Sequence, residues 1–593
     1  MILELSVKET TQPHILARIT VEQILYGVAV MTAAVIRLTG LTNIPLSPAE
    51  ATDALSVYEF WQPGAAAVVS GSPAYFSLTS LLTQVLGFSD GVMRLVPALF
   101  GIALSLLPWF LRHRLGSAGA LVTGFLLALS PILSLLARTT GGQSIALFSG
   151  LLLFIAWLRY QESDNPRWFI TAVTALALGL SSSPIFYSSI ISLLLAWLVV
   201  RVVGPALFTD EEGEPRPLFR PSQELLRRSL IIGGAVFAAA ATLFLWNLPG
   251  LNGVARSLGD WLGLFLASAN LTTWLGPVLA LARYETILLL IAGPGIVWAV
   301  WHGRPFPTLL VYWLTGSMLL MLVQRGYMDN LAVLALPGYL LAGRFVGDMT
   351  KTRAGWYRWA LAGVLLIFGM LLYFNIVRYS RLAGNTNVLL EPSSSSYIFM
   401  LVAGLLFVLI IFFYIWNVSV SDAKQGMIYG LVAILLFFTW GTTWNLTQFH
   451  ANDTRERLIG SASDDELPML AKMIREVSHQ TGNGENGLEI LMTIDSPALR
   501  WYLRDFNNLV IDGALPRTIS SQALITPMES TPSLETGYVG ANFGYFRPNT
   551  EQFLTAAAAL QWWFFHQSSV TINEERAIFW LRADLAGENF EVQ

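Results

Sequence analysis

The amino-acid sequence predicts a polytopic α-helical membrane protein with a small soluble α/β domain at its C-terminal end. Its 593 residues are 54% hydrophobic and only 12% charged, whereas ordinary soluble domains carry about 25% charged residues. The mean hydropathy of +0.56 agrees with this composition. Long apolar runs fill residues 1–450, and residues 451–593 lack them. We therefore expect a transmembrane domain over 1–450 and an α/β domain over 451–593.

Membrane spans are predicted wherever an apolar run reaches about 20 residues, the length that crosses roughly 30 Å of hydrocarbon. About thirteen runs approach this length. They lie near residues 21–41, 92–111, 117–137, 144–160, 168–183, 184–203, 229–247, 284–301, 306–323, 329–346, 358–377, 396–417 and 427–446.

The distribution of basic residues predicts the orientation of these spans, because short loops rich in Lys and Arg favour the cytoplasmic side. A cytoplasmic N-terminus puts basic turns such as 112–114 and 159–167 on that side, and the long loops 42–91 and 248–283 on the other. From Ala451 onward the chain holds 10 Lys and Arg against 19 Asp and Glu, a net charge of −9, and the remainder carries +5. We expect a multi-pass plasma-membrane protein with an extracytoplasmic C-terminal domain.

The C-terminal domain is predicted from alternating helical and strand patterns. Residues 464–480 have the spacing of an amphipathic helix. Short apolar runs bounded by Gly, Pro and Asn predict strands. These runs are 488–494, 509–511, 523–526 and 577–581.

The start of loop 42–91 carries two acidic residues at helical spacing. Ser47-Pro48-Ala49-Glu50 is a capping-box pattern, in which Ser and Glu side chains satisfy free backbone N–H groups, so a structural role for Glu50 is available. Asp53 follows one turn later on the same helix face. Two carboxylates on one face can also deprotonate an acceptor hydroxyl or bind a divalent metal ion. Glu50 and Asp53 are therefore candidate catalytic residues.

The second long loop, 248–283, contains a predicted helix over residues 254–269. Its apolar residues Leu258, Trp261, Leu262 and Phe265 recur at helical spacing. This pattern is typical of a helix that lies in the membrane interface. A packed re-entrant connection explains the same residues.

Arginines at the predicted exported ends of spans form a third group of candidates. A charge near hydrocarbon is costly, and it persists where it forms an ion pair, reaches the headgroups or binds an anion. The guanidinium group matches phosphate with two parallel hydrogen bonds. Arg94, Arg138 and Arg325 are therefore candidate phosphate ligands.

Several other kinds of chemistry are disfavoured by the sequence. The chain has no Cys, which excludes thiolate metal sites and cysteine nucleophiles. It has no G-x-x-x-x-G-K-[ST] loop and no H-E-x-x-H pair, and its six His are scattered. Nucleotide hydrolysis and zinc proteolysis are disfavoured, and no nucleic-acid partner is expected. A divalent metal ion held by the acidic residues is the one cofactor that stays open.

Several segments of the first half resemble the C-type (GT-C) membrane glycosyltransferases, in particular the dolichyl-phosphate-mannose protein mannosyltransferases and aminoarabinose transferases. They are the acidic helix start Pro48 to Ala51, Gly71 to Phe76, Arg94 to Gly101, and Leu129 to Arg138. In the C-terminal domain, Asp495 to Phe506 and Phe579 to Leu585 are similar to a prokaryotic branch associated with flippases in archaeal glycosylation.

The resemblance implies transfer of a sugar from a polyprenyl-phosphate donor to an acceptor protein or glycolipid on the outer side, with inversion. In these families an Asp-Glu pair starts the first loop helix, and the Asp is usually taken as the base. Here the matching pair is Ala49-Glu50. Glu50 takes over as base, or Asp53 replaces the missing acid, or this copy is inactive. Arg94, Arg138 and Arg325 would bind the donor phosphate.

A second hypothesis accommodates the missing Asp. The chain would then be a non-catalytic GT-C-like membrane subunit, or a factor associated with flipping of lipid-linked sugars. Its partners would be membrane lipids and other proteins of a membrane complex. Loss of the acidic pair favours this alternative, whereas retention of Glu50, Arg94 and the long exported loops favours the enzyme.

Overall fold

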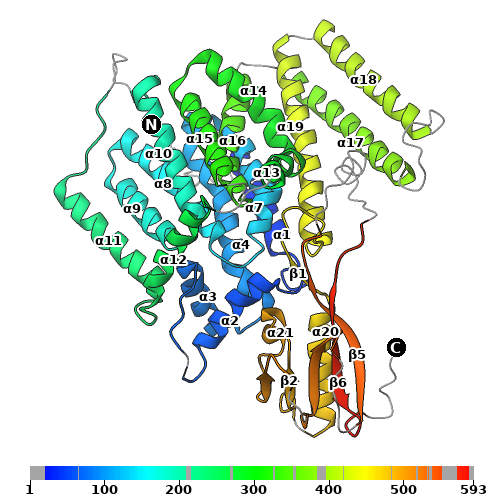
Figure 1. Ribbon diagram of the computed structural model, residues 1–593. Helices are drawn as coiled ribbons and strands as arrows, with labels where there is room; N and C mark the ends of the chain where they lie inside the picture. The colour runs from blue at the N-terminus through cyan, green and yellow to red at the C-terminus, as the bar shows by residue number, and fades with distance from the viewer. Residues whose placement is uncertain are drawn as a thin grey trace, which may run out of the picture.

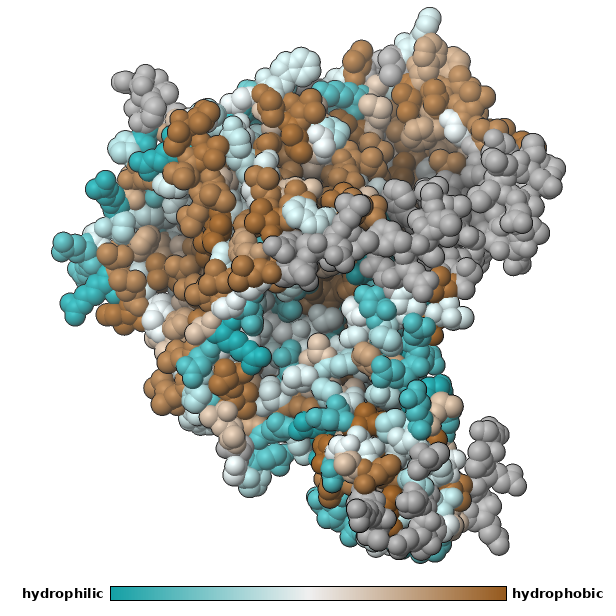
Figure 2. Space-filling view, in the orientation of Figure 1, coloured by the Kyte–Doolittle hydropathy of each residue, from teal (hydrophilic) through white to brown (hydrophobic). Residues whose placement is uncertain are grey.

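The computed structural model combines a large helical body with a smaller sheet domain at one end (Figure 1). It describes residues 20–586 apart from 65, 209–215, 267–270, 325–326, 352–354, 384–394, 418–419, 483, 516–518, 531, 533–536 and 551–569. Apolar side chains cover the helical body, and polar side chains are more frequent toward the sheet domain (Figure 2). This division matches the predicted fold class.

Nine helices within the described part of the chain are long and apolar enough to cross a membrane. They are α1 (Val21–Leu38), α4 (Asp90–Leu106) continued by η2 (Leu107–Leu111) and α5 (Arg112–Leu115), α8 (Gln143–Ser163), α10 (Ile185–Val203), α11 (Gln223–Thr242), α15 (Pro305–Val323), α16 (Asn330–Met349), α17 (Tyr357–Ala383), and α19 (Val420–Trp444) continued by η3 (Asn445–Phe449).

The other predicted spans fall on helices that are bent or short. The pair α13 (Leu271–Tyr284) and α14 (Thr286–His302) bends by 94°. Shorter apolar helices are α6 (Ser117–Leu129), α9 (Pro166–Leu180) and part of α18 (Ser395–Asn417). Every predicted apolar run therefore overlaps at least one helix, but thirteen complete crossings stay a prediction.

The predicted span 117–137 illustrates why length alone overestimates crossings. Helix α6 ends at Leu129, and a separate helix α7 (Pro131–Leu136) follows. Proline cannot donate the backbone hydrogen bond that would continue α6 but suits a first helical position. Ser130 caps α7 by accepting a hydrogen bond from Leu133 N at 3.3 Å. The chain therefore breaks at the Ser-Pro step.

The two long loops contain helices of their own. Loop 42–91 folds into α2 (Pro48–Phe60) and α3 (Pro73–Leu86). The helix predicted over 254–269 is α12 (Gly250–Gly263), which begins four residues earlier and ends within the described part of that range. Figure 1 shows α2, α3 and α12 at the end of the helical body that faces the sheet domain.

The C-terminal region forms a mixed six-stranded sheet with strand order β1-β5-β6-β4-β2-β3. Its elements are β1 (Ala462–Ser463), α20 (Glu466–Gln480), β2 (Ile490–Met492), α21 (Pro497–Tyr502), β3 (Leu509–Ile511), β4 (Ala523–Pro527), β5 (Tyr538–Arg547) and β6 (Glu575–Arg582). β2 pairs in parallel with β3 and β4, and the other pairs are antiparallel. The predicted α/β character is correct, although β1 and β5 were not predicted.

Small residues bring α6 and α16 unusually close together at the centre of the helical body. A Cβ atom added to Gly343 of α16 would collide with Thr123 Oγ1 and Gly119 O of α6. Helix α16 is buried along almost its whole length. Close helix contact through glycines is a common way to pack membrane helices.

We predict that Gly343→Val lowers the thermal unfolding midpoint of the detergent-solubilised protein. The added side chain must displace backbone atoms of α6, and overpacking of this kind costs about 1–3 kcal/mol or more. Gly363→Val in α17 is the matched control, because a Cβ there meets nothing within 4 Å. Equal midpoints for the two variants would contradict the close packing of α6 and α16.

Candidate functional site

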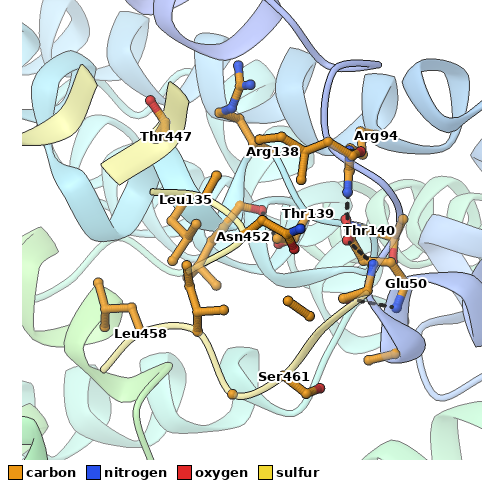
Figure 3. A pocket seen from close by; sticks show the side chains of 18 of the residues that line it. Glu50, Arg94, Leu135, Arg138, Thr139, Thr140, Thr447, Asn452, Leu458 and Ser461 are labelled. Carbon is orange, nitrogen blue, oxygen red and sulfur yellow. Dashed lines mark hydrogen bonds and ion pairs between the residues drawn. The ribbon is translucent and has the colours of Figure 1, made fainter. Parts of the chain in front are cut away.

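A cavity of about 320 Å³ lies between the helical body and the segment that leads into the sheet domain (Figure 3). Four of the five predicted site residues line it: Glu50, Asp53, Arg94 and Arg138. Arg325 lies outside the described residues. The remaining lining includes Thr139, Thr140, Gln143, Asp329, Asn452 and residues 458–462.

The carboxylate of Glu50 accepts four hydrogen bonds, and the residue is only 6% exposed. The capping box is present, with Ser47 N donating to Glu50 Oε2 at 2.9 Å and Glu50 N donating to Ser47 Oγ at 3.4 Å. Arg94 donates from Nε and Nη2 to the two carboxylate oxygens at 2.7 Å each. Thr140 N donates to Oε1 at 3.2 Å. The structural role that the sequence allowed for Glu50 is therefore realised.

Burial alone would raise the pKa of Glu50, but the Arg94 guanidinium and the hydrogen bonds from Arg94, Ser47 and Thr140 lower it below its usual value. A carboxylate that is stabilised in its ionised form and already accepts four hydrogen bonds is a weak proton acceptor. This geometry argues against Glu50 as the general base.

Arg94 also donates hydrogen bonds to backbone carbonyl groups. Its Nη1 donates to Leu41 O at 2.9 Å and Ile44 O at 2.8 Å, and its Nη2 donates to Pro45 O at 3.1 Å. Together with the two bonds to Glu50, these use all five N–H donors of the guanidinium. Binding of a donor phosphate by Arg94 is not supported, because Arg94 instead holds the α1–α2 connection and the start of α2.

Arg138 binds backbone carbonyl groups at the end of α1. Its guanidinium donates to Ile36 O at 2.9 Å, Thr39 O at 2.6 Å and Gly40 O at 3.2 Å. Among the residues that the structure describes, no carboxylate lies within ion-pair distance of Arg138. Within that part of the chain, no direct ion pair cancels the positive charge of Arg138, which borders the cavity.

The carboxylate of Asp53 accepts fewer hydrogen bonds than the carboxylate of Glu50. Among the described residues, its side chain accepts one hydrogen bond, from Thr140 Oγ1 to Oδ2 at 3.0 Å. Burial raises the pKa of Asp53 to about 6, the hydrogen bond from Thr140 opposes this shift, and the nearby charge of Glu50 adds to it. A base with a pKa near the working pH is well suited to accept a proton from a substrate. Asp53 therefore fits the role of general base better than Glu50.

Asp329, which precedes α16, was not predicted as a site residue. It lines the same cavity, and its Oδ2 accepts a hydrogen bond from Tyr327 OH at 3.0 Å. Burial raises its pKa, against the hydrogen bonds from Tyr327 and Gln143. A sequence signal that could have identified Asp329 is an acidic residue at the predicted exported end of span 329–346. Thr140 was missed because its role, bridging Glu50 and Asp53, depends on folding.

The acidic residues do not fit a metal ion. Within the described ranges, no group of three or more His, Asp or Glu residues could hold a metal ion. Glu50, one of the two predicted metal ligands, is already engaged in an ion pair with Arg94.

The sheet domain contacts the loop that carries the site. Tyr502 OH donates to Asp90 Oδ2 at 2.6 Å and accepts a hydrogen bond from Leu46 N at 2.9 Å. Trp501 Nε1 donates to Asp90 Oδ1 at 2.8 Å, and Ser463 Oγ donates to Leu46 O at 2.6 Å. Leu46 directly follows the carbonyls that bind Arg94. The sheet domain thus fixes both polar groups of the Leu46 backbone.

We predict that Glu50→Gln destabilises the fold strongly. Removal of one partner from a buried ion pair costs about 3–5 kcal/mol, which a thermal unfolding midpoint in detergent would detect. Because the pKa of Glu50 is lowered, the stabilisation is present at neutral pH and is lost as the pH falls through that lowered pKa.

The control for this experiment is Glu59→Gln, because the Glu59–Arg500 pair is exposed and such pairs contribute about 0–1 kcal/mol. If Glu59→Gln and Glu50→Gln shifted the midpoint equally, the buried pair would not be the stabilising contact that we infer.

We predict energetic coupling between Tyr502 and Asp90. Tyr502→Phe removes the hydrogen bond to the Asp90 carboxylate, and hydrogen bonds to charged groups contribute about 1.5–3 kcal/mol. In a double-mutant cycle with Asp90→Asn, the unfolding midpoints should be non-additive. Strictly additive effects would show that the two side chains act independently.

Sequence comparison gives one family match. Residues 70–210 match the family model described as dolichyl-phosphate-mannose-protein mannosyltransferase. This range includes Arg94, Arg138 and Thr140 but not Glu50 or Asp53. No curated protein matches the sequence.

Comparison of structures covers nearly the whole chain. ArnT from Cupriavidus metallidurans, bound to undecaprenyl phosphate, matches with a TM-score of 0.52 and 14% identity over 95% of this chain and 99% of ArnT. Its apo structure gives the same values. The apo oligosaccharyltransferase of Archaeoglobus fulgidus gives a TM-score of 0.47 and 10% identity over 82% of this chain and 64% of the other. Residues 70–210 are therefore similar to the dolichyl-phosphate-mannose-protein mannosyltransferase family, and the chain as a whole shares the fold of ArnT.

Proposed function

We propose that the protein transfers a sugar from a polyprenyl-phosphate donor to an acceptor protein or glycolipid on the extracytoplasmic side, with Asp53 as the general base. The observation that carries this proposal is the Asp53 carboxylate, which lines the cavity with a pKa raised to about 6. The fold shared with ArnT, whose structure contains undecaprenyl phosphate, supports the donor class.

The proposed reaction is a single displacement at the anomeric carbon of the donor sugar. The acceptor hydroxyl gives its proton to Asp53, and its oxygen forms the new bond to the anomeric carbon. The bond from that carbon to the phosphate oxygen breaks, and polyprenyl phosphate leaves with the electron pair. The configuration is inverted because attack and departure occur on opposite faces.

Arg138 is the residue best placed to favour the leaving phosphate. It borders the cavity, and its described contacts are backbone carbonyls rather than carboxylates. A positive charge that no direct ion pair neutralises stabilises the negative charge that develops on the phosphate. Arg94 and Glu50 hold the start of α2 and thereby position the wall of the cavity that carries Asp53. They do not take part in proton transfer.

The proposed site faces away from the cytoplasm. Helices α4, α8 and α16 begin beside the cavity or the sheet domain and end near Arg114, Glu162 and Arg344. Arg114 pairs with Glu162, and Arg344 Nη1 donates to Arg114 O at 2.7 Å. This basic end corresponds to a cytoplasmic surface. We propose that the N-terminus is cytoplasmic and that the sheet domain is extracytoplasmic.

We predict that Asp53→Asn lowers turnover of a radiolabelled polyprenyl-phosphate hexose by about 10²–10⁴-fold, the usual contribution of a general base. In the wild type, the rate should fall about tenfold per pH unit below pH 6, because protonated Asp53 cannot accept the proton. Thr52→Ala is the matched control, because Thr52 is exposed and its hydroxyl donates to Pro48 O of its own helix at 2.9 Å.

Binding of polyprenyl phosphate, measured separately, distinguishes the two hypotheses. An Asp53→Asn protein that binds the lipid but does not turn it over supports the enzyme. A wild type that binds the lipid and transfers no sugar supports the non-catalytic membrane subunit. Equal turnover by wild type and Asp53→Asn would exclude Asp53 as the base.

A further inference from the structure

An exposed apolar surface surrounds the connection between α11 and α12. We call it the α11–α12 patch, and its side chains are between 42% and 68% exposed. It lies beside α3, where Leu243 N donates to Ser77 Oγ at 3.1 Å. Figure 2 shows hydrophobic surface at the lower end of α11, where the patch begins. The patch consists of Phe244, Leu245, Trp246, Leu248, Leu251, Leu258 and Leu262.

The first part of the patch is held by an unusual backbone turn. Leu243, Phe244 and Leu245 have φ values of 49°, 54° and 73°, in the left-handed region. Residues with a Cβ atom rarely adopt this conformation, and three in succession are costly. The turn buries Leu243 but leaves Phe244 and Leu245 more than 60% exposed. Backbone strain of this kind persists where the surroundings enforce it and often marks a functional segment.

Helix α12 has three distinct faces. Gly250, Gly253, Ser257 and Trp261 are buried against the body. Leu251, Leu258 and Leu262 share an exposed apolar stripe, and Asn252, Arg256 and Gly259 share an exposed polar stripe beside it. A helix with adjacent apolar and polar exposed stripes suits the boundary between headgroups and acyl chains.

The buried face of α12 prevents the patch from folding inward. A Cβ atom on Gly250 would collide with Ala241 O, and one on Gly253 with Ser70 O. Trp261 Nε1 donates to Ser188 Oγ at 3.0 Å. Because α12 is already seated this closely, its apolar stripe can be covered only from outside the described chain.

We propose that the α11–α12 patch is a membrane anchor that inserts into the phospholipid leaflet on the side of the sheet domain. The patch continues the lipid-facing surface of α11, on which Leu230, Ile231 and Ile232 are exposed. Trp side chains are enriched at membrane interfaces, and Trp, Phe and Leu are typical of the apolar face of helices that lie there. Arg256 on the polar stripe would face the lipid phosphates.

The anchor is connected to the wall of the cavity. Ser188 Oγ, which accepts the bond from Trp261, donates to Gln324 Oε1 at 3.0 Å. Asn330 Nδ2 donates to the same oxygen at 2.6 Å. Asn330 follows Asp329, which lines the cavity. The depth of α12 in the leaflet thereby sets the position of this wall relative to the lipid surface.

Single-cysteine spin labelling tests the proposal without any assumption about activity. The native chain has no Cys, so Trp246→Cys and Leu258→Cys each give one labelled site. The full chain would be reconstituted in phosphatidylcholine vesicles, and collisions of the label with O₂ and with a water-soluble nickel chelate would be measured. Asn252→Cys on the polar stripe is the matched control. Met528→Cys in the sheet domain and Leu405→Cys in α18 serve as water and bilayer references.

Labels at 246 and 258 should show several-fold lower nickel accessibility, and higher O₂ accessibility, than labels at 252 and 528. If the labels at 246 and 258 were as accessible to nickel as the label at 528, the patch would lie in water, available to a protein partner, and the proposal would be overturned. Both substituted side chains are exposed, and two independent sites keep the test decisive if one variant fails to fold.

Discussion

The buried ion pair between Arg94 and Glu50 is the interaction on which the cavity depends. Arg94 comes from a span and Glu50 from the first turn of a helix outside the spans. Their charges cancel in surroundings where an isolated charge would be very costly. Because both side chains are fully engaged within the protein, the pair fixes the start of α2 against α4. Asp53, one turn further along α2, is thereby left facing the cavity with unused hydrogen-bonding capacity.

Buried arginines play the same role at each reversal of the chain near the site. Arg94 binds carbonyls of the α1–α2 connection, Arg138 binds carbonyls at the end of α1, and Arg37 binds Ala128 O and Leu127 O at the end of α6 at 2.8 Å each. Helix ends leave carbonyl groups without partners, and little water is available within a membrane to satisfy them. The arginines supply those donors, which explains the position of Arg94 without a bound phosphate, whereas Arg138 also borders the cavity with its positive charge.

The sequence therefore predicted the positions of the site residues within helices better than it predicted the residues that they contact. The S-x-x-E pattern identified the start of α2, and helical spacing placed Asp53 on the same side as Glu50, because both depend only on local geometry. The sequence could not distinguish a structural role of Arg94 and Glu50 from a functional one. That distinction depends on how residues 39–45 pass over α4. Asp329 and Thr140 reach the cavity from distant parts of the chain. β5 was missed because Gly540 and Gly544 interrupt its apolar pattern.

The sheet domain is part of the site rather than an appendage. Residues 458–462 form one wall of the cavity, and Tyr502 and Ser463 hold Leu46 from the other side of the domain boundary. The apolar core of the sheet is continuous with α2 through Ala51 and Leu55. A displacement of the sheet domain would therefore move the backbone that binds Arg94, and with it Glu50 and Asp53. We infer that the proposed chemistry requires both domains, because neither one alone encloses Asp53.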